Sequence, residues 1–208
     1  TLTSGRPTVT DIIPLGCCSE PELLALAASV EARSEHPVAQ AIVQEARRQG
    51  LAFEPCEDLQ AITGRGARAT AADGRVYFIG NRELFDGRLV LTDSVLAQLD
   101  NLERQGRTAM LLAGQSDGEL AVLGLIAVAD SIRPGARAAL DALRREGVSP
   151  IVMLTGDNVQ VASAIARQAG VDEYRAGLLP EQKVDAVQQL AAEYGSVAMV
   201  GDGVNDAP

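Results

Sequence analysis

Two apolar segments in the C-terminal third of the chain are each followed at once by a turn rich in glycine and aspartate. Ile151–Leu154 leads into Thr155–Asn158, and Val197–Val200 leads into Gly201–Asp206. Segments with helical patterning separate them, which is typical of parallel α/β sheets, where functional groups gather at the carboxyl ends of the strands. We therefore expect a parallel α/β domain with a site at that edge of its sheet.

The helices of this domain are indicated by the residues at their ends. One is expected from Pro134 to a glycine stop at Gly147, and a second from Asn158 to Ala169. A third is expected from Pro180 to Tyr194, directly before the second apolar segment. Proline in the first turn and glycine after the last turn are the usual start and stop signals of helices.

The first 125 residues have a different pattern, which predicts an α+β domain with an antiparallel sheet. Asp73-Gly74 is a hairpin signal, and Ser19 with Glu22 forms a capping box. The expected helices begin at Ser19, at Pro37 and near Ser94, and the expected strands are Leu59–Ile62, Arg75–Ile79, Thr108–Leu112 and Leu120–Val128.

These two patterns predict an inserted domain. Residues 1–9 and 127–208 would form the α/β domain, and residues 10–126 would be the α+β insertion between its first strand and the rest. The hinge is expected near Thr10 and Ala127.

Composition excludes several classes of protein. The net charge is −10, with 18 basic residues scattered among 28 acidic ones, which argues against a nucleic-acid surface. Cys17, Cys18 and Cys56 have neither a CxxC spacing nor a partner histidine, so plain thiols are expected rather than disulfides or a zinc site. The longest apolar run, Leu120–Ala129, is too short to cross a membrane.

The two glycine-rich turns carry groups suited to phosphoryl chemistry. In Gly201–Asp206, two carboxylates beside open backbone N–H groups can hold one Mg²⁺. A GDG alone is equally typical of a structural turn, but GDGVNDAP is far more specific. Thr155 offers a hydroxyl and Asn158 caps the next helix. Lys183, by default an exposed lysine, can supply a fixed positive charge.

The order of these motifs resembles that of the haloacid-dehalogenase-type phosphotransferases and, within them, the P-type ATPases. Their first motif reads DKTGTLT, so Thr1–Thr3 match its last three residues and the phosphorylated aspartate would lie four positions before Thr1. The resemblance assigns Thr155 and Lys183 to the phosphoryl group, Asp157 to nucleotide, Asp202 to Mg²⁺, and Asn205 and Asp206 to the hydrogen-bonded shell of that metal.

Ser34-Glu35-His36-Pro37 narrows the resemblance to the heavy-metal P-type ATPases. It contains the only histidine of the chain, at the expected junction of two helices, where a lone histidine is commonly a surface or capping group. In this family the histidine orients adenine, and Glu31 matches the adenine-contacting glutamate.

Two glycine motifs complete the set. Gly64-Arg65-Gly66 lies in an expected turn, where missing side chains would let a nucleotide approach the backbone. The segment from Gly64 to Ala69 also satisfies the dinucleotide-binding pattern GxGxxA. That interpretation fails because the pattern should open a helix, whereas a strand is expected here. In the family this pair lines the ATP pocket together with Gly80 and Asn81, although Asn81 alone would be taken as a helix cap.

The resemblance implies ATP and Mg²⁺ as ligands, and a place in the cytoplasmic part of an integral membrane protein. The partners would be the transmembrane helices and the actuator domain of the same polypeptide, with no nucleic acid, and the chain itself would be monomeric. The 208 residues contain no DKTG, so they are expected to bind nucleotide without phosphoenzyme turnover.

The transported metal and the class of protein leave alternatives. Arg175–Lys183 looks more like zinc, cadmium and lead exporters, whereas SEHP is frequent in copper transporters. The first alternative to a transporter is a soluble phosphatase of the same superfamily, with residues 10–126 as a cap domain. The second is a regulatory nucleotide-binding module.

Overall fold

The computed structural model describes residues 2–116 and 118–201, and their contacts divide them into two units. The sheet unit comprises residues 6–102 and 107–130. The α/β unit comprises, among the described residues, 2–5, 103–106 and 131–201.

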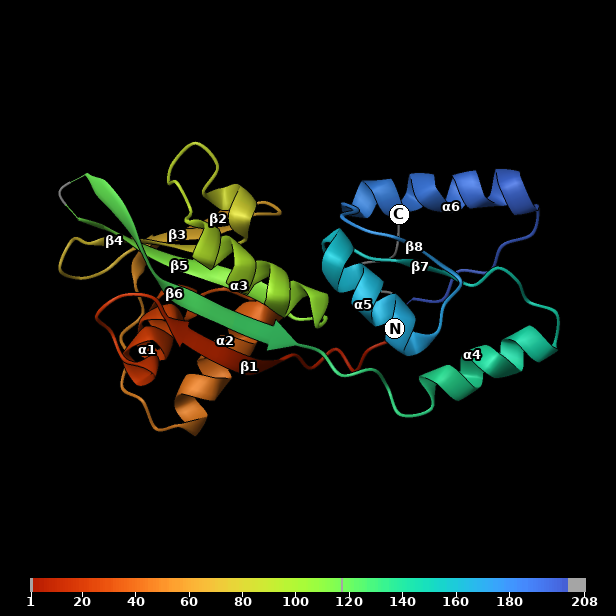
Figure 1. The fold of residues 1–208 in the computed structure, drawn as a ribbon, viewed down its shortest axis with the longest axis horizontal. Helices are drawn as coiled ribbons and strands as arrows, with labels where there is room; N and C mark the ends of the chain where they lie inside the picture. The colour runs from red at the N-terminus through yellow and green to blue at the C-terminus, as the bar shows by residue number, and fades with distance from the viewer. Residues whose placement is uncertain (1, 117, 202–208) are drawn as a thin grey trace. The chain divides into compact units, whose positions relative to one another are not determined.

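The sheet unit is built on a six-stranded antiparallel sheet (Figure 1). Its spatial order is β1-β6-β5-β4-β3-β2. The strands are β1 (Thr8–Pro14), β2 (Glu57–Ile62), β3 (Gly66–Thr70), β4 (Val76–Gly80), β5 (Thr108–Ser116) and β6 (Glu119–Ala129). The hairpin expected at Asp73-Gly74 is confirmed, since β3 and β4 pair antiparallel across it.

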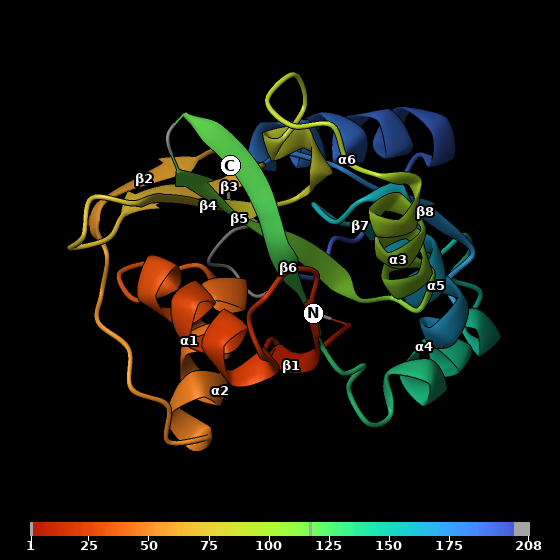
Figure 2. The ribbon, with the colours of Figure 1, turned by 60° about the vertical axis from the view of Figure 1, so that its left-hand side comes forward.

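Helices cover both faces of this sheet, which explains why its central strands are apolar throughout (Figures 1 and 2). On β6, Leu125 and Ala127 face one core while Ile126 and Val128 face the other, as the two-residue period of a strand requires. The first core is shared with α1 (Glu20–Glu31) and α2 (Pro37–Arg48); the second is shared with α3 (Asp93–Arg104) and the short 3₁₀ helix η1 (Arg82–Leu84).

Several helix ends confirm local sequence signals. The carboxylate of Glu22 accepts from the backbone N–H of Ser19 at 2.8 Å, as a capping box requires. Proline lies in the first turn of α1 and of α2. These signals act within one helical turn, so the sequence alone is enough to reveal them.

The first strand lies in a different place from the one expected. Thr8 and Val9 pair with Ala129 and Val128 of β6, and a register shift follows at Thr10. Contacts separate the two units at residues 5/6 and 130/131, so the positions expected for the hinge, Thr10 and Ala127, lie inside paired strands. The limits 1–9, 10–126 and 127–208 for the functional domains stay a prediction.

The α/β unit contains a parallel pair of strands, β7 (Val152–Leu154) and β8 (Glu173–Arg175), the second of which the sequence did not predict. Its helices are α4 (Ala136–Arg145), α5 (Val159–Ala169) and α6 (Pro180–Tyr194). A small core joins Met153 to Ala162 and Ala166 of α5. Near the start of the chain, Thr3 forms an isolated antiparallel bridge with Ile132.

The strand expected over Val197–Val200 is wrong for this structure. The segment has no strand geometry, and Val200 is 74% exposed. A strand is defined by hydrogen bonds to a neighbour, and among the described residues of this unit β7 pairs with β8 and not with this segment. Apolar residues before a glycine-rich turn are therefore not sufficient to form a strand.

No helix within residues 2–116 and 118–201 combines the length and the apolar character that crossing a membrane requires.

Candidate functional site

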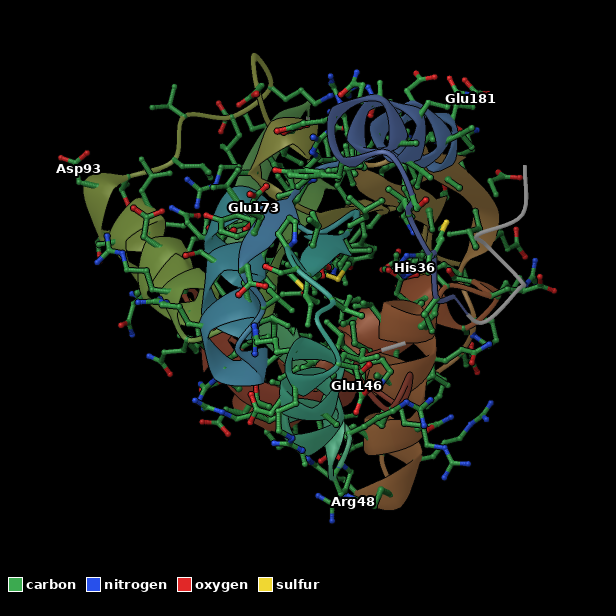
Figure 3. All side chains as sticks on the ribbon, turned by 90° about the vertical axis from the view of Figure 1, so that its right-hand side faces the viewer. His36, Arg48, Asp93, Glu146, Glu173 and Glu181 are labelled. Atoms are coloured by element: carbon green, nitrogen blue, oxygen red, sulfur yellow. The ribbon has the colours of Figure 1, made fainter. Side chains whose placement is uncertain are left out.

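The junction between α1 and α2 holds the residues of the SEHP motif. Glu31 is the last residue of α1, and its carbonyl accepts from the Ser34 N–H at 2.9 Å, which closes the turn. His36 is the N-cap of α2 and is exposed (Figure 3). Local backbone bonds therefore bring Glu31 and His36 to one short junction.

Glu31 is a buried carboxyl group, with only 4% of the residue exposed. Loss of solvation raises its pKa from 4.5 to about 7, and a hydrogen bond with the Ser34 side chain partly opposes the rise. A carboxyl group with this pKa exchanges a proton near neutral pH, so it can present either a donor or an acceptor to a ligand.

The imidazole of His36 has one nitrogen engaged by the protein. Its Nδ1 accepts from the backbone N–H of Val38 at 3.3 Å, as an N-cap side chain does. An accepting ring nitrogen carries no proton, so in the neutral ring the proton lies on Nε2. The cap thus fixes the tautomer and leaves a defined N–H donor on the far side of an exposed ring.

Gly64, Gly66 and Gly80 have different surroundings. Gly66 and Gly80 are paired across β3 and β4, and a Cβ on either would lie 2.1 Å from a backbone oxygen, of Ile79 or Arg65 respectively. Gly64 has φ +72° and nothing within 4 Å of its Cβ position. Of the three, only Gly64 has the open backbone that a close ligand needs.

Asn81 follows this glycine crossing and bonds back to the turn. Its backbone N–H donates to the Arg65 carbonyl at 2.9 Å, and its Nδ2 donates to the Gly64 carbonyl at 2.9 Å. Its Oδ1 accepts from the Leu84 N–H at 3.2 Å, which confirms the helix-cap interpretation. The structure therefore joins Gly64, Gly66, Gly80 and Asn81 in one cluster.

In the α/β unit, Thr155 begins the turn that follows β7. The Thr155 hydroxyl donates to Asp157 Oδ2 at 2.8 Å and accepts from the Asp157 N–H at 3.1 Å. The loop after β8 holds this turn from the other side, since Gly177 donates to the Asp157 carbonyl at 2.7 Å and Leu178 to the Thr155 carbonyl at 3.1 Å. Any acceptor bound by the Thr155 hydroxyl must replace Asp157 as its partner.

The structure describes Asn158 and Lys183, two of the other residues predicted for this unit. Asn158 caps α5 through Oδ1 at 2.9 Å from the Val161 N–H, as expected. Lys183 lies in the first turn of α6, where its N–H donates to the Leu179 carbonyl, and its side chain is half-buried. Asp202, Asn205 and Asp206 lie outside the described residues.

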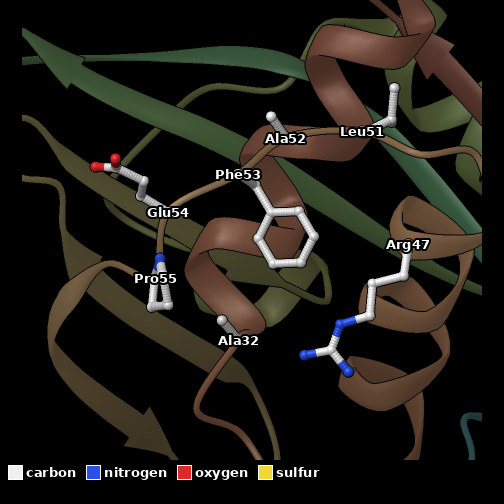
Figure 4. Close-up of a pocket in the computed structure, with 7 residues that line it drawn as sticks. All are labelled: Ala32, Arg47, Leu51, Ala52, Phe53, Glu54 and Pro55. Carbon is white, nitrogen blue, oxygen red and sulfur yellow. The ribbon is translucent and has the colours of Figure 1, made fainter.

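Among the described residues there is no metal cluster, and a surface hollow is lined by residues other than those named above. No group of three or more His, Cys, Asp or Glu among them can hold a metal ion. A surface hollow of about 750 Å³ is lined by Ala32, Arg47 and residues 51–55 (Figure 4). None of the residues singled out from the sequence lines it, although Ala32 directly follows Glu31 at the end of α1.

Sequence reasoning missed two parts of these sites. Ser34 was named only as part of its motif, although its side chain lowers the pKa of Glu31. Gly177 and Leu178 were not assigned to the Thr155 turn, because the bonds that link them cross about twenty residues of chain. A parallel partner strand after α5 was the signal that could have placed them.

Comparison with known proteins extends these observations. The family model for haloacid dehalogenase-like hydrolases matches residues 1–208. A probable cadmium-transporting ATPase of Alkalihalophilus pseudofirmus is 40% identical over all of this chain and 29% of its own length. A copper-exporting P-type ATPase of Bacillus subtilis is 41% identical over all of this chain and 25% of its own length. The chain thus spans less than a third of the curated relatives it matches.

A solved structure of the catalytic domain of the CPx-ATPase CopB-B, which concerns conformational changes on nucleotide binding, has a TM-score of 0.68 and 30% identity. The match covers 99% of this chain and 69% of that one. The chain therefore belongs to the haloacid dehalogenase-like hydrolase family, in which its relatives are the heavy-metal P-type ATPases.

Proposed function

We propose that this chain is the ATP-handling part of a heavy-metal-transporting P-type ATPase. The observation that carries the proposal is the α1–α2 junction, to which both a buried Glu31 and a capping His36 with a fixed tautomer belong. A defined donor and a carboxyl group of adjustable charge at one junction suit a purine ring, whose edge carries both donors and acceptors.

The sheet unit is proposed to bind ATP. His36 Nε2–H and the Glu31 carboxyl would contact the adenine, and the open backbone at Gly64 would face the rest of the nucleotide. The residues proposed to form this nucleotide site, by contact or by shaping it, are Glu31, His36, Gly64, Gly66, Gly80, Asn81 and, in the α/β unit, Asp157.

The α/β unit is proposed to receive the phosphoryl group that ATP supplies. The Thr155 hydroxyl would exchange Asp157 for a phosphoryl oxygen, and the Lys183 ammonium would offset its charge. Asp202 is proposed as the Mg²⁺ ligand, with Asn205 and Asp206 supporting it by hydrogen bonds. That metal would neutralise phosphate charge.

In the whole protein, ATP hydrolysis through an aspartyl phosphate would drive the export of a metal cation. The partners would be transmembrane helices and an actuator domain of the same polypeptide, with this part on the cytoplasmic side. Cadmium and copper transporters match the chain almost equally, at 40% and 41% identity, so zinc or cadmium as cargo stays a proposal based on Arg175–Lys183.

Isothermal titration of the 208-residue chain with ATP tests nucleotide binding. We expect a dissociation constant between about 1 µM and 1 mM, and a weakening of roughly five- to tenfold in His36→Gln and in Glu31→Ala, the factor that one lost hydrogen bond represents. Arg48→Ala, a change at an exposed ion pair on the far end of α2, is the matched control and should bind normally.

Four outcomes would contradict the proposal or a part of it. No binding of ATP by the unsubstituted chain would refute it. Equal affinity in both site variants and the control would leave His36 with its capping role alone. Vanadate-sensitive, Mg²⁺-dependent ATPase activity would refute the expectation of binding without phosphoenzyme turnover, and hydrolysis of small phosphate esters without nucleotide preference would favour a phosphatase.

A further inference from the structure

The turn between β2 and β3 has a bonded side and an open side. The Arg65 N–H donates to the Ile62 carbonyl at 2.9 Å, which closes the turn internally. Gly64 and Arg65 are exposed, while Gly66 already belongs to the ladder with β4. A ligand that approaches this turn therefore meets Gly64 and Arg65 before any strand residue.

The two glycines behind the turn are required by packing between strands. At Gly66 an added Cβ would lie 2.1 Å from the Ile79 oxygen, and at Gly80 it would lie 2.1 Å from the Arg65 oxygen. Real Cβ atoms never approach a backbone oxygen so closely, so neither position can carry a side chain while β3 and β4 stay paired. These glycines let the two strands touch, which places Asn81 directly behind the turn.

Asn81 then bonds three backbone groups. Two of its bonds reach the turn, at the carbonyl oxygens of Gly64 and Arg65, and the third caps η1 at Leu84. The cap at Leu84 fixes the side-chain amide, so that its Nδ2 is held toward Gly64. Both the Nδ2 and the Oδ1 atom of the Asn81 side chain are thus hydrogen-bonded to backbone groups of the protein.

We propose that Asn81 is a positioning residue, which presents the Gly64–Arg65 backbone to the nucleotide through its bond to the Gly64 carbonyl and does not contact the nucleotide itself. This inference rests on the proposed function, because it assigns a role within the same ATP site.

The physical reason is the freedom of glycine. Gly64, at φ +72°, has no Cβ to restrict its backbone, so without further bonds the turn has alternative conformations of similar energy. A hydrogen bond that removes those alternatives before the ligand arrives lowers the entropy lost on binding. Without the bond from Asn81, the ligand must order the turn itself, and its affinity falls although no ligand contact has been removed.

Asn81→Ser is the variant that separates the bonds. A serine hydroxyl still caps the Leu84 N–H but is too short to reach the Gly64 carbonyl, and unlike aspartate it adds no charge near the phosphates. Thr92→Ala is the matched control, because Thr92 Oγ1 makes a cap bond of the same kind to Val95 in the same unit, away from the turn.

Two measurements are made on each variant. Calorimetry with ATP is expected to show about fivefold weaker binding for Asn81→Ser and no change for Thr92→Ala. Amide hydrogen exchange without nucleotide is expected to be about fivefold faster at the Arg65 N–H group in Asn81→Ser, since this group belongs to the loosened turn, and unchanged in the control.

Weaker binding with unchanged exchange in the nucleotide-free chain would overturn the inference, because it would mean that Asn81 contacts the ligand directly. Faster exchange with unchanged affinity would also overturn it, since the order of the turn would not matter. If the unsubstituted chain binds no ATP, the proposed function fails together with the inference, and the exchange data then report only a structural turn.

Discussion

Replacing Glu31 with glutamine tests whether this carboxyl is buried in its protonated form. Folding raises the pKa of Glu31 from 4.5 to about 7, chiefly through loss of solvation. Between these values the folded chain holds a proton that the unfolded chain releases. The carboxyl therefore favours the folded state fully below pH 4.5, and this contribution is lost as pH rises toward 7.

The magnitude follows from the two pKa values. Each pKa unit corresponds to about 1.4 kcal/mol, so the free energy of unfolding should fall by about 2.5 kcal/mol between pH 5 and pH 8 through this group alone. Glutamine has no proton to lose and can still bond Ser34. The stability of Glu31→Gln relative to the unsubstituted chain should therefore increase by about 2.5 kcal/mol over the same range.

The assay is urea unfolding at pH 5 and at pH 8, followed by the amide signals of β5 and β6, which belong to the same unit as Glu31. Every other titrating group is common to both chains and cancels in the difference. Glu22→Gln is the control: hydrogen bonds from Ser19 lower the pKa of Glu22, so it is ionised in both states above pH 5 and adds no slope.

A stability difference between Glu31→Gln and the unsubstituted chain that is the same at both pH values would refute this reasoning. It would mean that the buried carboxyl is already ionised at pH 5 and that bonding from Ser34 outweighs desolvation.

Two further predictions concern packing and acid stability. Gly66→Ala should lower the free energy of unfolding of the sheet unit by about 2 to 3 kcal/mol, because its methyl group would collide with the Ile79 oxygen. Gly64→Ala, in open space but at positive φ, should lower it by about 1 kcal/mol. Equal losses of stability in urea unfolding would contradict this prediction. In the α/β unit, hydrogen bonding from the Ile151 N–H lowers the pKa of Asp172, so this carboxylate stabilises the unit above pH 3.8 and the contribution disappears as pH falls through the lowered value. Asp172→Asn should therefore destabilise the unit by about 1 kcal/mol at pH 7 and by less in acid, and a loss measured by exchange of the β7 amides that stays constant down to pH 3 would count against it.

Features set within a few residues could be predicted from the sequence. The capping box at Ser19, the proline start of α2 at Pro37, the cap at Asn158 and the hairpin at Asp73-Gly74 all agree with the structure. Each depends on bonds between residues at most four apart, which is why a local pattern is enough.

Strand pairing could not be predicted from local patterns in this way. Thr8 pairs in the ladder with Ala129, more than a hundred residues along the chain, and no local sequence pattern predicts such a partner. Val197–Val200 has the composition of a buried strand but no partner among the described residues, and it is not a strand. Composition gives a segment its propensity to form a strand, but the strand forms only when a neighbouring segment offers free backbone groups for hydrogen bonding.

The family, the order of the motifs and the residue types in both sites could be predicted from the chain alone, since these need only the identity and spacing of side chains. The role of each of these residues depends on tertiary contacts. In the folded structure, strand packing requires glycine at Gly66 and Gly80, whereas the backbone at Gly64 is open. The Asn81 side chain bonds the Gly64 carbonyl, and burial raises the pKa of Glu31 to about 7. The reason is that burial, close approach and hydrogen bonding are properties of pairs distant in sequence, which exist only once the chain has folded.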